Sequence, residues 1–125
     1  MTSPPESTPV AERLARMVSR FAVAAQAHQR SLDVMDEAGA AAHVRVLHGL
    51  YAAIVREGER GEEAFLLLLE SDNDVVAGMA AVFTLQSATE RALVVLRRLA
   101  AGEGLLGFRA RYALERWEKG EWQQP

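Results

Sequence analysis

Apolar residues recur at steps of three and four positions along most of the chain, and this spacing constrains the fold more than any other feature. Residues three and four apart lie on one face of an α-helix, so each stripe predicts a helix with one buried face. No segment alternates apolar and polar residues for long, as a half-buried strand would. The pattern therefore predicts an all-α fold of about six helices, whose short links make neighbouring helices antiparallel.

Proline, glycine and capping residues divide this pattern into elements. Residues 1–8 are expected to be a disordered tail, and residues 9–122 a single helical domain whose first helix begins at Thr8-Pro9 and ends near Glu37. The alanine-rich segment 38–42 is expected to turn the chain at Gly39. The five later helices are expected to end near Arg56, Glu70, Gln86, Ala101 and Lys119. Asn73 is expected to cap the start of the fourth helix, and residues 87–90 form a capping box that opens the fifth. Gly120 is expected to end the sixth helix.

Composition narrows the classes of function. The 125 residues include no cysteine, which excludes disulfides, thiolate nucleophiles and cysteine zinc sites, and makes the cytoplasm the expected location. The net charge of -3 argues against a nucleic-acid binder, because neutralising phosphates supplies most of that affinity. The start of the chain lacks a secretion-signal pattern, and the longest apolar run, AFLLLL, is too short to span a bilayer.

The second half of the chain contains an internal repeat. Four positions of the expected fourth helix match four positions of the sixth at a constant offset of about 32 residues, which is typical of HEAT-type helical hairpins. The matched pairs are Val76 with Phe108, Ala80 with Tyr112, Ala81 with Ala113 and Leu85 with Trp117. Stacked hairpins hide each other's apolar faces, so this pattern predicts an α-α superhelix of three hairpins.

Several segments also resemble a known family. They are VSRFAVAAQAHQRSLD, LHGLYAAIVREG, LLLLESDNDVVAGMAA and, most specifically, LAAGEGLLGFRARYALERWEKGEW. Together they resemble the bacterial family of unknown function called DUF2019, over nearly the whole chain except the tail. One departure is Ala77-Gly78, where HEAT-like helices commonly carry arginine after the valine. The resemblance implies a small α-α superhelix and no particular activity.

The C-terminal segment supplies the first candidate partner-binding residues. Ala110, Ala113, Leu114 and Trp117 share one helix face and are expected in the core, whereas Phe108 and Tyr112 lie nearly opposite. That second face either packs on a neighbouring hairpin or is an exposed anchor for a partner, edged by Arg109, Arg111 and Arg116. Trp122, beyond Gly120, either folds back on the last helix or contacts a partner.

Acidic residues supply the second candidate surface. The stretch from Glu57 to Asp74 contains seven carboxylates against Arg60 alone. One interpretation is a solvated edge of loop ends and first helical turns. The other is an acidic surface that docks a basic partner. The candidate residues are Glu59, Glu62, Glu63, Asp72 and Asp74.

The sequence gives little support for a metal site, a catalytic site or nucleic-acid binding. His43 and His48 are five residues apart and do not converge on one metal, and no catalytic or phosphate-binding motif is present. We therefore expect no catalytic residue, metal or cofactor. Seven basic residues lie between Arg91 and Lys119, but interleaved glutamates favour pairing along the helices over nucleic-acid binding.

The resulting expectation is a non-enzymatic module that binds another protein, specifically an immunity- or antitoxin-like inhibitor of a toxin or effector. No membrane partner is expected. One alternative is a small enzyme or nucleic-acid-binding protein that uses a groove between hairpins lined by Tyr51, His48 and arginines. A homodimer with a structural role is a further alternative.

Overall fold

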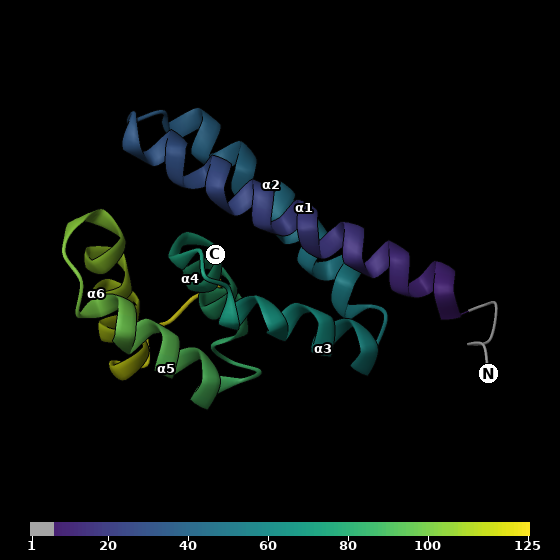
Figure 1. Ribbon diagram of the computed structural model, residues 1–125. Helices are drawn as coiled ribbons and strands as arrows, with labels where there is room; N and C mark the ends of the chain where they lie inside the picture. Colours follow the sequence, from purple (N-terminus) through teal and green to yellow (C-terminus); the bar gives the residue numbers. More distant parts are fainter. Residues whose placement is uncertain (1–6) are drawn as a thin grey trace. The chain divides into compact units, whose positions relative to one another are not determined.

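The computed structural model describes residues 7–125, which form six α-helices, one short 3-10 helix and no strand (Figure 1). The predicted all-α class and the number of helices are confirmed. The chain divides into two compact units, Met1–Phe65 and Leu66–Pro125, and each is described by itself below. The prediction that residues 9–122 form one superhelical domain concerns how these units combine, and it stays a prediction. Of the predicted tail, residues 1–6 lie outside the described residues, whereas Ser7 and Thr8 belong to the first helix, which begins earlier than predicted.

The first unit is built on a hairpin of two long helices, α1 (Ser7–Asp33) and α2 (Glu37–Val55), which pack along each other (Figure 1). The third helix, α3 (Glu59–Leu66), ends at the boundary of the unit. Phe65 of α3 is buried, and its ring meets the edges of Phe21 and Tyr51 at centroid distances of 4.7 and 4.8 Å. Aromatic edge contacts of this kind stabilise a core beyond the area that they bury.

The turn between α1 and α2 lies earlier than predicted. The break falls at Val34–Asp36, where Met35 takes a left-handed backbone with φ 59°, and Gly39 lies inside α2. The Asp36 carboxylate accepts a hydrogen bond from the Gly39 backbone N–H at 2.9 Å and so caps α2. An aspartate cap in front of four alanines outweighs one glycine, because alanine is the strongest helix former. The Met35 side chain, at this turn, is 87% exposed.

The second unit begins with the 3-10 helix η1 (Leu67–Glu70), followed by α4 (Asp74–Thr84), α5 (Thr89–Ala100) and α6 (Gly104–Glu118). The predicted cap of α4 is confirmed, because the Asn73 side chain accepts hydrogen bonds from the N–H groups of Val75 and Val76. The AFLLLL run is helical as predicted, but it is shared between α3 and η1. α4 packs against η1 and α5, and α5 packs against α6.

The start of α5 differs from the predicted capping box. Ala88 is the N-cap and provides no side-chain cap, while the Thr89 hydroxyl donates to the carbonyl oxygen of Leu85 at 2.7 Å. The reason is a tight link, in which the N–H groups of Ser87 and Ala88 both donate to the Thr84 carbonyl. Thr89 therefore reaches back to α4 instead of forward into α5. Gly120, with φ 72°, follows the end of α6 as predicted.

Candidate functional site

Helix α6 has one buried face and one exposed apolar face. Leu105, Phe108 and Tyr112 are spaced by three and four residues and are 41%, 58% and 54% exposed. We call these three residues the α6 face. Neighbouring apolar side chains that are exposed together can mark a docking surface, whereas single exposed apolar residues are common. The two aromatic side chains are exposed in the structure, and their role as an anchor for a partner stays a prediction.

The opposite side of α6 holds this face in place. Ala110 and Ala113 are buried, as predicted, whereas Leu114 and Trp117 are half-buried. Gly107 is also buried, and a Cβ atom there would collide with the carbonyl group of Gly102. Small residues along this side let α6 approach α5 and the link between them closely. The α6 face therefore rests on a close-packed support.

Arg111 fixes the link between α5 and α6. Its Nη1 donates to the carbonyl oxygens of Ala100 and Gly102 at 2.8 and 2.9 Å. The last carbonyl groups of a helix lack partners within the helix, so a guanidinium that reaches them acts as a C-terminal cap. Arg111 was predicted to edge an aromatic anchor, but its guanidinium is bound to the backbone of the link.

Arg116 is the arginine that joins the α6 face. Its guanidinium carbon lies 5.7 Å from the centre of the Tyr112 ring, its Nη1 donates to the Tyr112 hydroxyl at 3.5 Å, and its Nη2 donates to the Glu121 carbonyl at 2.9 Å. These contacts place a positive charge beside the Tyr112 ring. Arg109, the third predicted arginine, is half-buried, and desolvation lowers the pKa of its guanidinium.

Trp122 lies beyond the glycine that ends α6. The Glu121 N–H donates to the Arg116 carbonyl at 2.9 Å, which directs the last residues away from the helix axis. The Trp122 side chain is half-buried, and its indole Nε1 is buried without a hydrogen-bond partner among residues 7–125. A buried indole N–H without an acceptor is unfavourable. Because the atom is buried within the chain, the structure agrees with a Trp122 side chain that folds back, and a contact of Trp122 with a partner stays a prediction.

The five predicted acidic residues are all exposed, but the unit boundary divides them. Glu59, Glu62 and Glu63 lie on α3 in the first unit, whereas Asp72 and Asp74 flank the start of α4 in the second. Asp74 accepts from Arg98 at 2.9 Å, and its charge is therefore already paired. The other four form no ion pair with a residue of the described part of the chain.

The groove lined by His48 and Tyr51 was the alternative drawn from the sequence, and it stays a prediction. His48 is exposed, and the Tyr51 ring packs on Phe65. Within residues 7–125 no three histidine, aspartate or glutamate side chains come together as a metal site.

α2 is the one described helix that is long and apolar enough to cross a membrane, with a mean hydropathy of 1.2. Such length and composition also occur in helices of soluble proteins.

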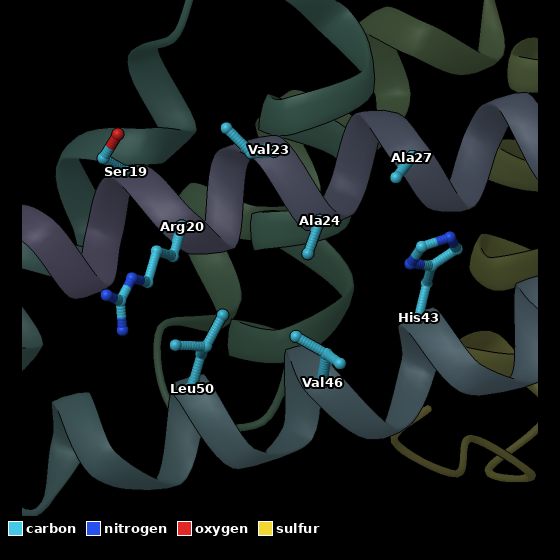
Figure 2. A pocket seen from close by; sticks show the side chains of 8 residues that line it. All are labelled: Ser19, Arg20, Val23, Ala24, Ala27, His43, Val46 and Leu50. Carbon is cyan, nitrogen blue, oxygen red and sulfur yellow. The ribbon is translucent and has the colours of Figure 1, made fainter.

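The α1–α2 hairpin has an apolar groove that the sequence pattern did not predict (Figure 2). It has a volume of about 470 Å³, and its lining residues are Ser19, Arg20, Val23, Ala24, Ala27, His43, Val46 and Leu50. The signal that could have found it is a second stripe on each helix, at positions 20, 23 and 27 and at positions 43, 46 and 50. A helix with two apolar stripes buries one in the hairpin and leaves the other for a further neighbour.

Comparison with known proteins supplies no family for this chain. No family model, no curated protein and no solved structure matches it.

Proposed function

We propose that the chain is a non-enzymatic protein-binding module and that the α6 face is its docking surface. The observation that carries the proposal is the difference in exposure between matched positions of the internal repeat. Val76 and Ala80 of α4 are 2% and 0% exposed, whereas their counterparts at the 32-residue offset, Phe108 and Tyr112, are more than half exposed. Two of the four matched positions are therefore core in α4 and surface in α6, whereas Ala81 and Ala113 are buried in both helices.

Stacked helical hairpins account for this difference. Each hairpin of such an array is covered by the next, and the terminal hairpin normally replaces its outer apolar residues by polar ones. The α6 face has kept leucine, phenylalanine and tyrosine at these positions. A surface of this kind is suited to a helix or helical hairpin of another protein, and Tyr112 with Arg116 supplies residue types that dominate binding energies at interfaces.

Affinity capture from the native host tests the proposal. Three baits are compared: the unmodified protein, the double variant Phe108→Ser with Tyr112→Ser, and the control Val94→Ser, which removes a 64% exposed valine from α5. We expect a protein that the unmodified bait and the control retain equally and that the double variant loses. Retention of the same proteins by all three baits would exclude the α6 face as the docking surface.

The specific form that we propose is an inhibitor of a toxin or effector, in which exposed acids meet a basic cleft. Glu59, Glu62 and Glu63 support this form, because they lie on one short helix without ion pairs to other described residues. Reversing these three to lysine is expected to weaken a captured complex at least about tenfold, mainly through slower association. Reversing Glu103, Glu118 and Glu121 instead gives the same net charge and serves as the control.

The proposal includes two further parts from the sequence. Membership of the DUF2019 family rests on the C-terminal segment quoted above, and a cytoplasmic location is supported by a chain that uses no cysteine. Fractionation of host cells, followed by detection of the untagged protein in each fraction, tests the location.

A further inference from the structure

We propose that the groove between α1 and α2 binds an acidic amphipathic helix of a partner protein, at a surface separate from the α6 face. Val23 and Val46, which line the groove from opposite helices, are 60% and 49% exposed. Ala24 is 7% exposed and forms part of the floor. Figure 2 shows Val46 and Leu50 extending from α2 toward α1, and Arg20 and Ala24 extending from α1 toward α2.

The spacing of the lining residues fits a third helix. On α1 the lining residues Arg20, Val23 and Ala27 belong to a stripe that Arg16 and Arg30 extend beyond the groove at either end, at alternating steps of four and three. On α2 it runs through His43, Val46, Leu50 and Ala53, at alternating steps of three and four. Alternating steps of this kind form the seam into which the side chains of a neighbouring helix insert. Two such seams side by side accept one helix, as in helix-in-groove recognition.

The charge around the groove identifies the chemistry of that helix. Residues 13–32 and 38–56 contain six arginines and no aspartate or glutamate, and the acidic residues of the hairpin lie at its ends, at Glu12, Asp33, Asp36, Glu37 and Glu57. Arg16, Arg20 and Arg30 are exposed and form no ion pair with a residue of the range 7–125. In the α1 stripe these arginines stand on both sides of the apolar centre formed by Val23 and Ala27.

The complementary ligand can therefore be described in some detail. It has apolar residues for about two turns and acidic residues at both ends, since Arg16 and Arg30 are separated by about 21 Å along a helix of this length. A second copy of the hairpin does not meet this description, because a twofold contact would place arginine against arginine. Like charges facing each other oppose association, whereas opposite charges favour it.

A designed peptide serves as the probe. It is a fluorescein-labelled helix of three heptads with leucine at the a and d positions of the middle heptad and glutamate at those of the outer two. Fluorescence anisotropy with the full chain measures binding. We expect this peptide to bind at least about tenfold more tightly than a peptide of the same composition in scrambled order, a difference of about 1.4 kcal/mol.

Charge exchange identifies the groove as the site. The double variant Arg20→Glu with Arg30→Glu is expected to bind the designed peptide at least about tenfold more weakly than the unmodified protein does. The same variant is expected to bind a second peptide, in which lysine replaces glutamate, as tightly as the unmodified protein binds the first. Arg60→Glu with Arg97→Glu changes the net charge equally at exposed positions elsewhere and is expected to leave binding unchanged. The variant Val46→Asp is expected to bind neither peptide, because its carboxylate lies in the apolar part of the groove. The double variant Phe108→Ser with Tyr112→Ser is expected to bind normally, which separates this inference from the proposed function.

Three results would overturn the inference. One is equal binding of the designed and scrambled peptides. The second is a dimer of the unmodified protein that Val46→Asp dissociates, which would assign the groove to a second copy. The third is binding to phosphatidylserine vesicles, but not to the peptide, that Arg20→Glu with Arg30→Glu abolishes, which would assign it to an anionic lipid surface. Circular dichroism of every variant confirms that the helices are retained.

Discussion

Helices α4 and α6 belong to the same unit and carry the same pattern of apolar positions, yet they are buried to different extents. Every residue of α4 from Val76 to Ala81 is buried, whereas α6 buries little more than Gly107, Ala110 and Ala113. Of its three aromatic side chains, Phe108 and Tyr112 are exposed and Trp117 is half-buried. Hydrophobic size alone therefore does not determine burial; the number of neighbours that a helix has decides it.

The largest expected effect comes from placing one charge at matched positions of the two helices. Ala80→Asp puts a carboxylate at a fully buried site and is expected to lower the free energy of unfolding by about 3–5 kcal/mol, because the charge has no partner there. Tyr112→Asp is expected to change it by less than about 1 kcal/mol, as at most surface sites. Guanidinium unfolding measures both. Similar losses in the two variants would contradict the comparison.

Glycines provide the second test, because α6 relies on close approach at one point. Gly107→Ala is expected to destabilise the protein by about 1–3 kcal/mol, since the new methyl group meets the Gly102 carbonyl. Gly49→Ala in α2 is the control, because nothing lies within 4 Å of its added Cβ. That change is expected to stabilise by about 0.5–1 kcal/mol through helix propensity. Thermal unfolding of both variants decides whether the support of the α6 face is as close as described.

The link between α5 and α6 gives a smaller effect. Arg111→Ala removes hydrogen bonds to the Ala100 and Gly102 carbonyl groups and is expected to cost about 1 kcal/mol. It should also speed amide hydrogen exchange in the link, which native-state exchange measures by residue. Arg97→Ala, on the exposed side of α5, serves as control with a change within about 0.5 kcal/mol. No difference between the two would mean that Arg111 does not hold the link.

The smallest effect is a pH dependence at the exposed end of α6. The hydrogen bond and the positive charge of Lys119 lower the pKa of the Glu115 carboxyl group. Because the folded-state pKa is below the unfolded one, the contribution to stability is present above the unfolded-state pKa and is lost as pH falls through the folded value. NMR titration of Glu115 measures the direction, and Lys119→Met should return its pKa toward the ordinary value. An unchanged pKa in that variant would contradict the assignment.

The sequence predicted the features that depend on local physics. Periodic apolar residues located the helices, and Asn73 and Gly120 located the start of α4 and the end of α6. The turn at Met35 was missed because a cap by Asp36 competes with the glycine four residues after Met35, and propensities alone do not rank the two. The groove and the exposure of Phe108 were not determined by the sequence, because a second apolar stripe shows only that a helix can have a second neighbour.

The double variant Phe108→Ser with Tyr112→Ser tests the central claim most directly, namely that the α6 face is kept for a partner and not for folding. The measurement is guanidinium unfolding of this variant and of the unmodified protein at several protein concentrations. The account predicts free energies of unfolding within about 1 kcal/mol of each other, independent of concentration. A loss of more than about 3 kcal/mol, the cost of truncating buried aromatic residues, would show that the face is part of the core.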